Sequence, residues 1–241
     1  MQNNSVCSSE TFDSLCGVTS NGAYNLTAMA SCCNYNNAIA AQIMKMAGGC
    51  QCILDFGAGQ GMIANRFEQP VICVEPDMAA SAKISSPHIA VSSIVNLEKG
   101  SFDFIYSVNV IEHIENDRKI LQQLTSLLKP SGRIFIFVPA RQELFSTMDE
   151  RVGHLRRYSH DQLVRLVAGA GCRVDDCRYF DSLGYLASVG LKLWGKNGWS
   201  GTLSANSVSL YDRFIFPISR CLDIALQPII GKNLILTGTK V

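Results

Sequence analysis

The stretch ILDFGAGQGMIANRF, residues 53–67, constrains the fold more strongly than any other part of the chain. Its apolar start ends in an acid, Asp55, and glycines follow at the alternate positions 57, 59 and 61. Because glycine has no Cβ atom, such a loop can turn tightly and bring its backbone close to a ligand. The stretch therefore predicts a buried strand, a ligand-binding loop and a short helix over residues 62–67.

Apolar runs alternate with helical patterns along the rest of the chain. The predicted strands cover residues 50–56, 71–76, 88–93, 102–110, 133–140, 172–180 and 233–240. The predicted helices cover residues 24–46, 62–67, 78–83, 116–128 and 161–170, with a turn over 129–132 and a capping box formed by Ser159 and Gln162. Continuous apolar strands separated by helices are typical of an α/β fold. We expect a doubly wound, seven-stranded, mostly parallel sheet that binds ligands at the carboxyl ends of its strands.

The pattern of apolar and polar residues divides the chain into four regions. Residues 1–23 are rich in Ser, Asn and Cys and are expected to form a loose N-terminal arm, and residues 24–181 form the α/β core. Residues 182–230 are a helical insert, and residues 231–241 carry the last strand of the core sheet. The insert is apolar and aromatic, which indicates an apolar substrate pocket. The same side chains can instead pack a helical subdomain onto the sheet or form a dimer face.

Charge and cysteine content narrow the classes of partner. Lysine and arginine number 21 against 20 aspartates and glutamates, without a basic run, so we expect no nucleic-acid partner. The cysteines are scattered without metal-binding spacing to histidine, so we expect no metal site and a reducing, cytoplasmic setting. No signal segment or membrane-spanning run is visible, so we expect no stable membrane insertion. The expected oligomeric state is a monomer or homodimer.

The acid before the glycines separates two kinds of ligand. A dinucleotide-binding loop reads G-x-G-x-x-G, but Met62 occupies its third glycine position counted from Gly57. A carboxylate at Asp55 would also repel a pyrophosphate, whereas it would attract an amino group. The loop favours a ligand with a positive charge, and an NAD(P)-dependent oxidoreductase is the less favoured alternative.

Four segments, in the same order, resemble the motifs of class I S-adenosylmethionine-dependent methyltransferases of small molecules. Residues 55–61 resemble motif I, acid-x-Gly-x-Gly-x-Gly, and VICVEPD at 71–77 resembles the second motif. FDFIYSVNVIEHI at 102–114 resembles the fourth-strand motif with its Glu112-His113 pair, and LLKPSGRIFIFVPA at 127–140 resembles the later turn and strand. The resemblance implies S-adenosyl-L-methionine as cofactor, and methyl transfer to oxygen or nitrogen of a small, largely apolar molecule.

The same resemblance implies a set of cofactor-binding residues. The set comprises Asp55, Gly57, Ala58 and Gly59 around the methionine part, Glu75 on the ribose, Pro76 and Ser92 beside the adenine, Asn109 and Val110 near the sulfonium, and Tyr35 as an aromatic cover. Ser92 departs from the family pattern, which often has an acid there to bind the adenine amine.

Candidate acid–base residues lie in the segment MDERVGHLRRYS, residues 148–159, after the fifth predicted strand. The segment resembles a GH-x-RRY stretch of related enzymes, in which His154 is the candidate general base, with His113 as a second candidate. The candidate substrate-binding residues are Tyr24, Arg157, Tyr158, Tyr185 and Trp194. The alternative interpretation is that this segment anchors its loop to the next helix.

Two further alternatives keep the fold and change the chemistry. Some relatives use the charge of the sulfonium to steer a cyclisation or rearrangement without methyl transfer. A non-catalytic partner subunit would retain the fold without binding the cofactor.

Overall fold

A computed structural model describes residues 32–194 and 205–241, so the predictions for the N-terminal arm and Tyr24 lie outside the described residues. The strands are β1 Ile53–Phe56, β2 Val71–Val74, β3 Ile89–Val91, β4 Phe102–Val108, β5 Leu128–Pro139, β6 Cys172–Phe180 and β7 Asn233–Lys240. The helices are α2 Cys33–Ala47, α3 Met78–Ser81, α4 Asp117–Leu127, α5 Thr147–Val152, α6 His160–Ala168, α7 Ser182–Trp194, α8 Ala205–Leu210 and α9 Phe216–Leu226. Shorter turns of helix are η2 Ala64–Arg66, η3 Ile111–His113, η4 Gln142–Leu144 and the π-helical η6 Tyr211–Ile215.

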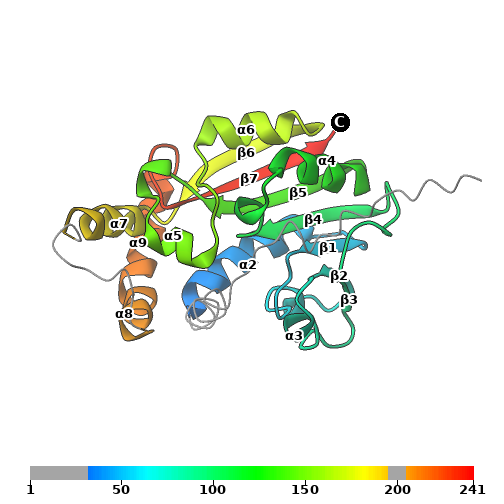
Figure 1. The fold of residues 1–241 in the computed structure, drawn as a ribbon, viewed down its shortest axis with the longest axis horizontal. Helices are drawn as coiled ribbons and strands as arrows, with labels where there is room; N and C mark the ends of the chain where they lie inside the picture. The colour runs from blue at the N-terminus through cyan, green and yellow to red at the C-terminus, as the bar shows by residue number, and fades with distance from the viewer. Residues whose placement is uncertain (1–31, 195–204) are drawn as a thin grey trace, which may run out of the picture.

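The seven strands form a sheet in the order β3-β2-β1-β4-β5-β7-β6 (Figure 1). Neighbours from β3 to β5 pair in parallel, whereas β7 lies antiparallel between β5 and β6. The predicted doubly wound, mostly parallel sheet is confirmed, and the order reverses between β1 and β4. Ligand sites of such sheets lie at the carboxyl ends of the strands beside this reversal.

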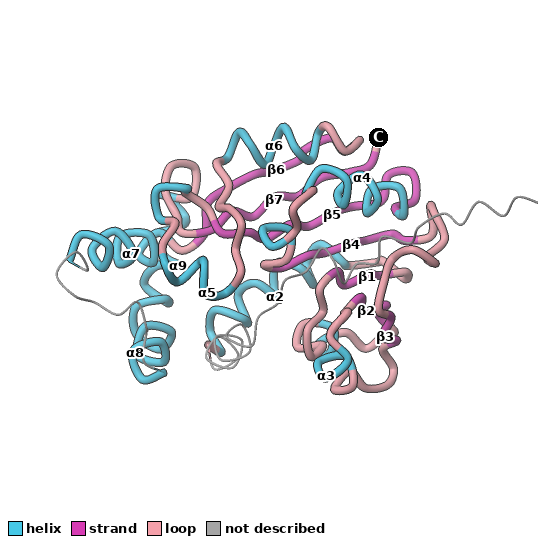
Figure 2. Tube along the Cα trace, in the orientation of Figure 1, coloured by secondary structure: helices cyan, strands magenta, loops and turns pink. Residues whose placement is uncertain are grey.

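The central strands β1, β4 and β7 are buried on both faces, whereas β3 is largely exposed. Figure 2 shows α4 and α6 along one side of the strands and α2 along the other. Ile105 of β4 packs in the same cluster as Leu121 of α4, whereas its neighbour Tyr106 packs in the same cluster as Ile43 of α2. Because successive side chains of a strand point to opposite faces, a strand buried on both faces must be apolar throughout. This burial explains the continuous apolar runs of the sequence.

Two local predictions are wrong. Residues 129–132 were expected to form a turn, but they lie within β5, where the register with β4 jumps from Phe102↔Leu128 to Phe104↔Arg133. The extra residues form a bulge, and Ser131 adopts a φ of 62°.

The helix expected over residues 62–67 is reduced to the 3₁₀ turn η2. Phe67, which follows η2, has an extended backbone and is buried in the core cluster that α2 contributes to. Burial of this aromatic ring outweighs the weak helical preference of a short segment.

The helical insert between β6 and β7 is attached to the first helix of the core. Asp212 of η6 is buried and accepts hydrogen bonds from the backbone N–H groups of Asn34 at 3.0 Å and Tyr35 at 2.8 Å. These N–H groups belong to the first turn of α2, where helical donors lack partners inside the helix. A carboxylate from the insert therefore caps α2, in the position where the helix dipole also favours negative charge.

We expect Asp212→Ala to lower the free energy of unfolding by about 1–3 kcal/mol, because it leaves buried N–H groups without an acceptor. Urea denaturation would measure the change. Asp161→Ala is the matched control, since the side chain of Asp161 is 75% exposed in the first turn of α6. Equal stability of the two variants would contradict the capping role of Asp212.

Among the described residues, we find no helix with the length and apolar character that crossing a membrane requires.

Candidate functional site

The glycine loop leaves β1 at the reversal of strand order. The N–H groups of Gly57 and Ala58 both donate to the carbonyl oxygen of Val74, at 2.9 and 3.1 Å, and so tie the loop to the end of β2. Gly57, Gly59 and Gly61 have φ values of 82°, 55° and 76°. Side chains other than glycine rarely adopt this region, so the backbone conformation explains the alternating glycines.

Gly57 and Gly59 face different surroundings. A Cβ atom at Gly57 would lie 2.2 Å from Cγ2 of Val110, so the chain after β4 packs directly against this glycine. Among residues 32–194 and 205–241, none lies within 4 Å of a Cβ atom placed at Gly59. The loop is thus closed on the Val110 side and open at Gly59, which leaves backbone accessible to a ligand.

Asp55 is the acid that precedes the loop, and it is almost fully buried. The hydroxyl of Tyr106 donates to its Oδ2 at 2.9 Å. Burial raises the pKa of Asp55 to about 7, although the Tyr106 hydrogen bond opposes the shift and Glu75 adds to it. A nearby cation would favour the charged form of this carboxyl group.

Glu75 follows β2 and bridges the two strand ends. Its Oε2 accepts a hydrogen bond from the N–H of Gly59 at 2.7 Å, and its Oε1 accepts one from the N–H of Asp77 at 2.9 Å. Pro76 beside it is half-buried, and Ser92 after β3 is exposed. The carboxylate therefore sits against the glycine loop, as the sequence motifs imply for a ribose-binding acid.

Asn109 follows β4 with a φ of 54°, and its N–H donates to the carbonyl oxygen of Phe137 at 2.9 Å. Asparagine is one of the few residues that tolerate this conformation. Since β2, β1 and β4 are neighbouring parallel strands, Asp55, Glu75 and Asn109 lie at one edge of the sheet. The structure brings these three predicted residues together.

Tyr35 has the contacts of a core residue. Its hydroxyl accepts a hydrogen bond from Nδ2 of Asn233 at 2.7 Å. Its ring packs edge-on or tilted against Phe137, Phe180 and Phe216, with centroids 5.1–6.2 Å apart. The structure thus places Tyr35 between α2, the sheet and α9.

Two histidines meet at the same edge, after β4 and after α5. The rings of His113 and His154 lie edge to face with centroids 4.8 Å apart. Nδ1 of His154 is 2.8 Å from Oδ1 of Asp149, and its Nε2 is 3.7 Å from Oε1 of Glu112. Arg157 donates to both oxygens of Asp149, through Nε at 2.8 Å and Nη2 at 3.1 Å. The structure therefore joins the two candidate acid–base residues in one partly buried network.

The pKa values in this network diverge. Burial raises the pKa of Glu112 to about 8, and burial together with the charge of His154 lowers the pKa of His113 to about 4. For Asp149, burial would raise the pKa, but the hydrogen bond from His154 and the charge of Arg157 outweigh it and hold the pKa at about 2. Asp149 is therefore ionised at neutral pH and can orient His154, leaving Nε2 of that ring as a proton acceptor.

The remaining substrate candidates lie in different places. The hydroxyl of Tyr158 is buried and donates to Oδ2 of Asp117 at 3.0 Å, so this side chain ties its loop to α4. Tyr185 on α7 is half-buried, with the guanidinium of Arg141 5.5 Å from its ring centroid. Trp194 ends α7, and its side chain lies outside the described ones.

Asp149 is a candidate functional residue that sequence reasoning did not assign. It accepts a hydrogen bond from the N–H of Ser146, and the two residues form a capping box at the start of α5. The spacing Ser-x-x-Asp at 146–149 is the sequence signal that predicts this helix start. The second task of the carboxylate, holding His154 and Arg157, depends on tertiary contacts.

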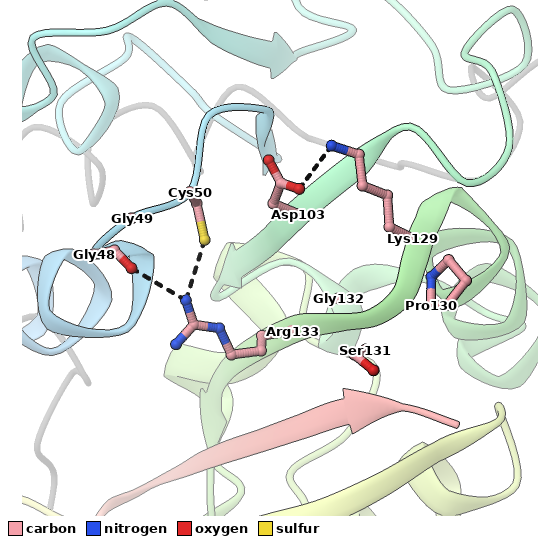
Figure 3. A pocket seen from close by; sticks show the side chains of 9 residues that line it. All are labelled: Gly48, Gly49, Cys50, Asp103, Lys129, Pro130, Ser131, Gly132 and Arg133. Carbon is pink, nitrogen blue, oxygen red and sulfur yellow. Dashed lines mark hydrogen bonds and ion pairs between the residues drawn. The ribbon is translucent and has the colours of Figure 1, made fainter.

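A pocket of about 280 Å³ lies at the opposite edge of the sheet, by the starts of β1 and β5 (Figure 3). Its charged groups have partners: Lys129 pairs with Asp103 at 2.7 Å, and Arg133 donates to the carbonyl oxygen of Gly48 and to Sγ of Cys50. These contacts join α2, β4 and β5, which indicates a structural role.

Comparison with known proteins identifies methyltransferases among the relatives of this chain. A family model described as methyltransferase domain matches residues 34–176. An uncharacterized methyltransferase of Mycobacterium bovis is 29% identical over 100 residues, which cover 36% of this chain and 50% of the relative. The ubiquinone biosynthesis O-methyltransferase of Xanthomonas euvesicatoria is 26% identical over 98 residues, covering 35% of this chain and 41% of that protein. The chain spans about half the length of the curated relatives it matches.

Solved structures share the fold at low sequence identity. A methyltransferase of Thermotoga maritima, described as a possible histamine N-methyltransferase, superposes with a TM-score of 0.60 at 15% identity, covering 88% of this chain and 92% of that one. Phosphoethanolamine N-methyltransferase 2 of Haemonchus contortus, in complex with S-adenosyl-L-methionine, gives a TM-score of 0.56 at 19% identity, covering 84% and 52%.

Proposed function

The chain belongs to the methyltransferase domain family, and from this membership we propose that it is an S-adenosylmethionine-dependent methyltransferase acting on an oxygen or nitrogen atom of a small, largely apolar molecule. The observation that carries the proposal is the buried Asp55 beside a glycine loop that is open at Gly59. The O-methyltransferase of Xanthomonas euvesicatoria, which matches part of the chain, supports oxygen as the first acceptor to test.

The residues of the loop fit this cofactor. The Asp55 carboxyl group would pair with the ammonium of the methionine part, whose charge would hold it ionised. The open backbone at Gly59 would admit the methionine part without a side chain in the way. Each oxygen of Glu75 accepts one hydrogen bond within the protein and keeps a lone pair for a ribose hydroxyl. The bound cofactor supplies a methyl group on sulfur that is already activated for in-line displacement.

The task of the protein is then to align the acceptor, exclude water and receive a proton. Nε2 of His154 would take the proton of the acceptor, Asp149 would hold the Nδ1–H and stabilise the resulting imidazolium, and Arg157 would position Asp149. General-base catalysis of this kind contributes about 10²–10⁴ in rate. The apolar insert, with Tyr185 on α7, is the proposed acceptor-recognition element.

S-adenosylmethionine that carries a ¹³C-labelled methyl group tests the proposal. We expect calorimetry to detect binding of S-adenosylmethionine, and mass spectrometry to find one ¹³C-methyl group on a phenol or amine from a panel of small aromatic acceptors. Binding of a pyridine dinucleotide in place of the sulfonium compound would overturn the cofactor. Turnover of an acceptor without label in the product would favour the cyclisation or rearrangement alternative.

His154→Ala is expected to lower kcat by about 10²–10⁴ while the affinity for the cofactor stays unchanged, because the base contacts the acceptor and not the glycine loop. Steady-state kinetics with an acceptor that takes up the labelled methyl group, together with calorimetry of cofactor binding, would measure both quantities. His160→Ala is the control, since this histidine is 42% exposed at the start of α6. Unchanged turnover in the His154 variant would retire the assignment.

A further inference from the structure

The strongest unassigned feature among the described residues is the cluster of Glu112, His113 and His154, hereafter the Glu112 cluster. Each residue offers a ligand atom, and these atoms all lie within 4.8 Å of one another. We propose that the Glu112 cluster binds a divalent transition-metal ion, with Zn²⁺ as the first candidate. Two imidazoles and one carboxylate are a common ligand set for such ions.

Glu112 is the observation that points to a ligand. Its side chain is completely buried, and neither carboxyl oxygen has a hydrogen-bond partner among the residues that the structure describes. A buried polar group without a partner is costly, and native proteins rarely retain one. Its oxygen Oε1 lies 3.7 Å from Nε2 of His154, so the unpartnered carboxyl group faces an imidazole nitrogen that also offers a lone pair, and a bound cation would favour its charged form. A cation between these two atoms would satisfy both.

A hydrogen bond at Nδ1 of each histidine ring orients the ring for metal binding through Nε2. Nδ1 of His113 lies 3.0 Å from the carbonyl oxygen of Gly153, which can only accept, so this nitrogen carries the proton. Nδ1 of His154 donates to Asp149, which Arg157 holds in place. Both rings therefore present an unprotonated Nε2. Metal-bound histidines almost always have such a carboxylate or carbonyl partner on the other nitrogen.

The backbone holds the cluster together before any ion binds. Glu112 and His113 come from η3 after β4, and His154 follows α5. The N–H of Leu155 donates to the carbonyl oxygen of Glu112, and the N–H of His154 donates to that of Asp149, both at 2.9 Å. The three ligand atoms need to approach by roughly 1 Å to reach the spacing expected around an ion with bonds of about 2.1 Å.

Three protein ligands leave coordination positions open. This step rests on the proposed function. The acceptor would then be a hydroxyl compound such as a phenol or enol. Its oxygen would coordinate the ion and lose its proton near neutral pH. In the metal-bound protein the hydroxyl proton would pass to solvent, since Nε2 of His154 is then a ligand; the general-base role proposed for His154 applies to the metal-free protein. The sequence alone predicted no metal site, because His113 and His154 stand 41 positions apart, which is not a recognised metal-binding spacing.

The test uses the full chain, stripped with a chelator and titrated with Zn²⁺ by calorimetry and with Co²⁺ by visible absorption. We expect one tight site per chain, and visible Co²⁺ bands typical of low coordination number. Glu112→Gln and His154→Ala are each expected to weaken this site at least 100-fold, whereas His160→Ala leaves it unchanged. Near-UV circular dichroism would check that the variants are folded.

Cysteine thiols can also bind these ions, so the variants decide the outcome. Absence of a saturable site in the wild-type chain, or a site of equal affinity in the Glu112 and His154 variants, would overturn the metal proposal. Binding of S-adenosylmethionine is measured separately on the stripped protein. Failure of that binding, with the metal site intact, would count against the proposed function and leave the metal site standing.

Discussion

Asp55→Asn is expected to weaken S-adenosylmethionine binding by about 1.5–3 kcal/mol at pH 8, because the variant loses the charge on the group proposed to meet the ammonium of the cofactor. The wild-type affinity is expected to fall as the pH drops below about 7, where Asp55 takes up a proton, whereas the affinity of the variant stays flat. Calorimetric titrations from about pH 6 to about pH 8.5 would measure both effects. Asp161→Asn, an exposed acid on α6, is the control.

As the pH rises, the stability of the cofactor-free protein should fall, whereas the affinity of the wild type for the cofactor should rise. The pKa of Asp55 is higher in the folded chain than its ordinary value of 3.8, so the folded state binds the proton more tightly. The corresponding stability is present below pH 3.8 and is lost as the pH rises to about 7. Asp55→Asn removes this loss, so the variant should be more stable than the wild type at pH 8 and bind the cofactor less well. Unchanged cofactor affinity would remove Asp55 from the site.

Gly57→Ala is the substitution with the largest expected effect on the loop. Its Cβ would lie 2.2 and 2.9 Å from the two methyl carbons of Val110, and the backbone φ of 82° disfavours any side chain. Overpacking costs about 1–3 kcal/mol and the left-handed conformation about 1–2 kcal/mol, so we expect a loss of about 2–5 kcal/mol in the free energy of unfolding. Urea denaturation would measure it.

A double-mutant cycle isolates the contact. In Gly57→Ala combined with Val110→Ala, the methyl carbons are gone and the nearest contact is with Cβ at 3.1 Å. The double variant should therefore be more stable than the sum of the single effects by at least about 1 kcal/mol. Additive effects would show that Val110 does not confine the loop.

Gly59→Ala completes the comparison. No atom of the part of the chain that the structure describes lies within 4 Å of the added Cβ, so the strain of a φ of 55° is the expected cost and the stability loss should be smaller than for Gly57→Ala. The new methyl group would project into the space proposed for the cofactor. We expect its main effect on cofactor affinity, and an unchanged affinity would place the cofactor elsewhere.

Much of the fold was predictable from local pattern. All seven strands overlap the predicted ranges, and the central strands do so because burial on both faces of a sheet requires continuous apolar sequence. The outer strands β3 and β6 are more exposed. The meeting of Asp55, Glu75 and Asn109 was also predictable, since neighbouring parallel strands end at the same edge. The bulge at Ser131 and the short η2 turn were not, because strand register and the burial of Phe67 overrode local preference.

The sequence by itself determined the α/β class and the glycine loop with its acid, and it indicated the carboxyl edge for the candidate site, because burial periodicity and glycine conformation are local properties. Only the tertiary structure decided that Tyr35 packs against rings more than 100 residues away, and that Glu112 is left without a partner facing His154. Such pairings depend on how loops from different strands pack together. The spacing of residues along the chain does not predict that packing.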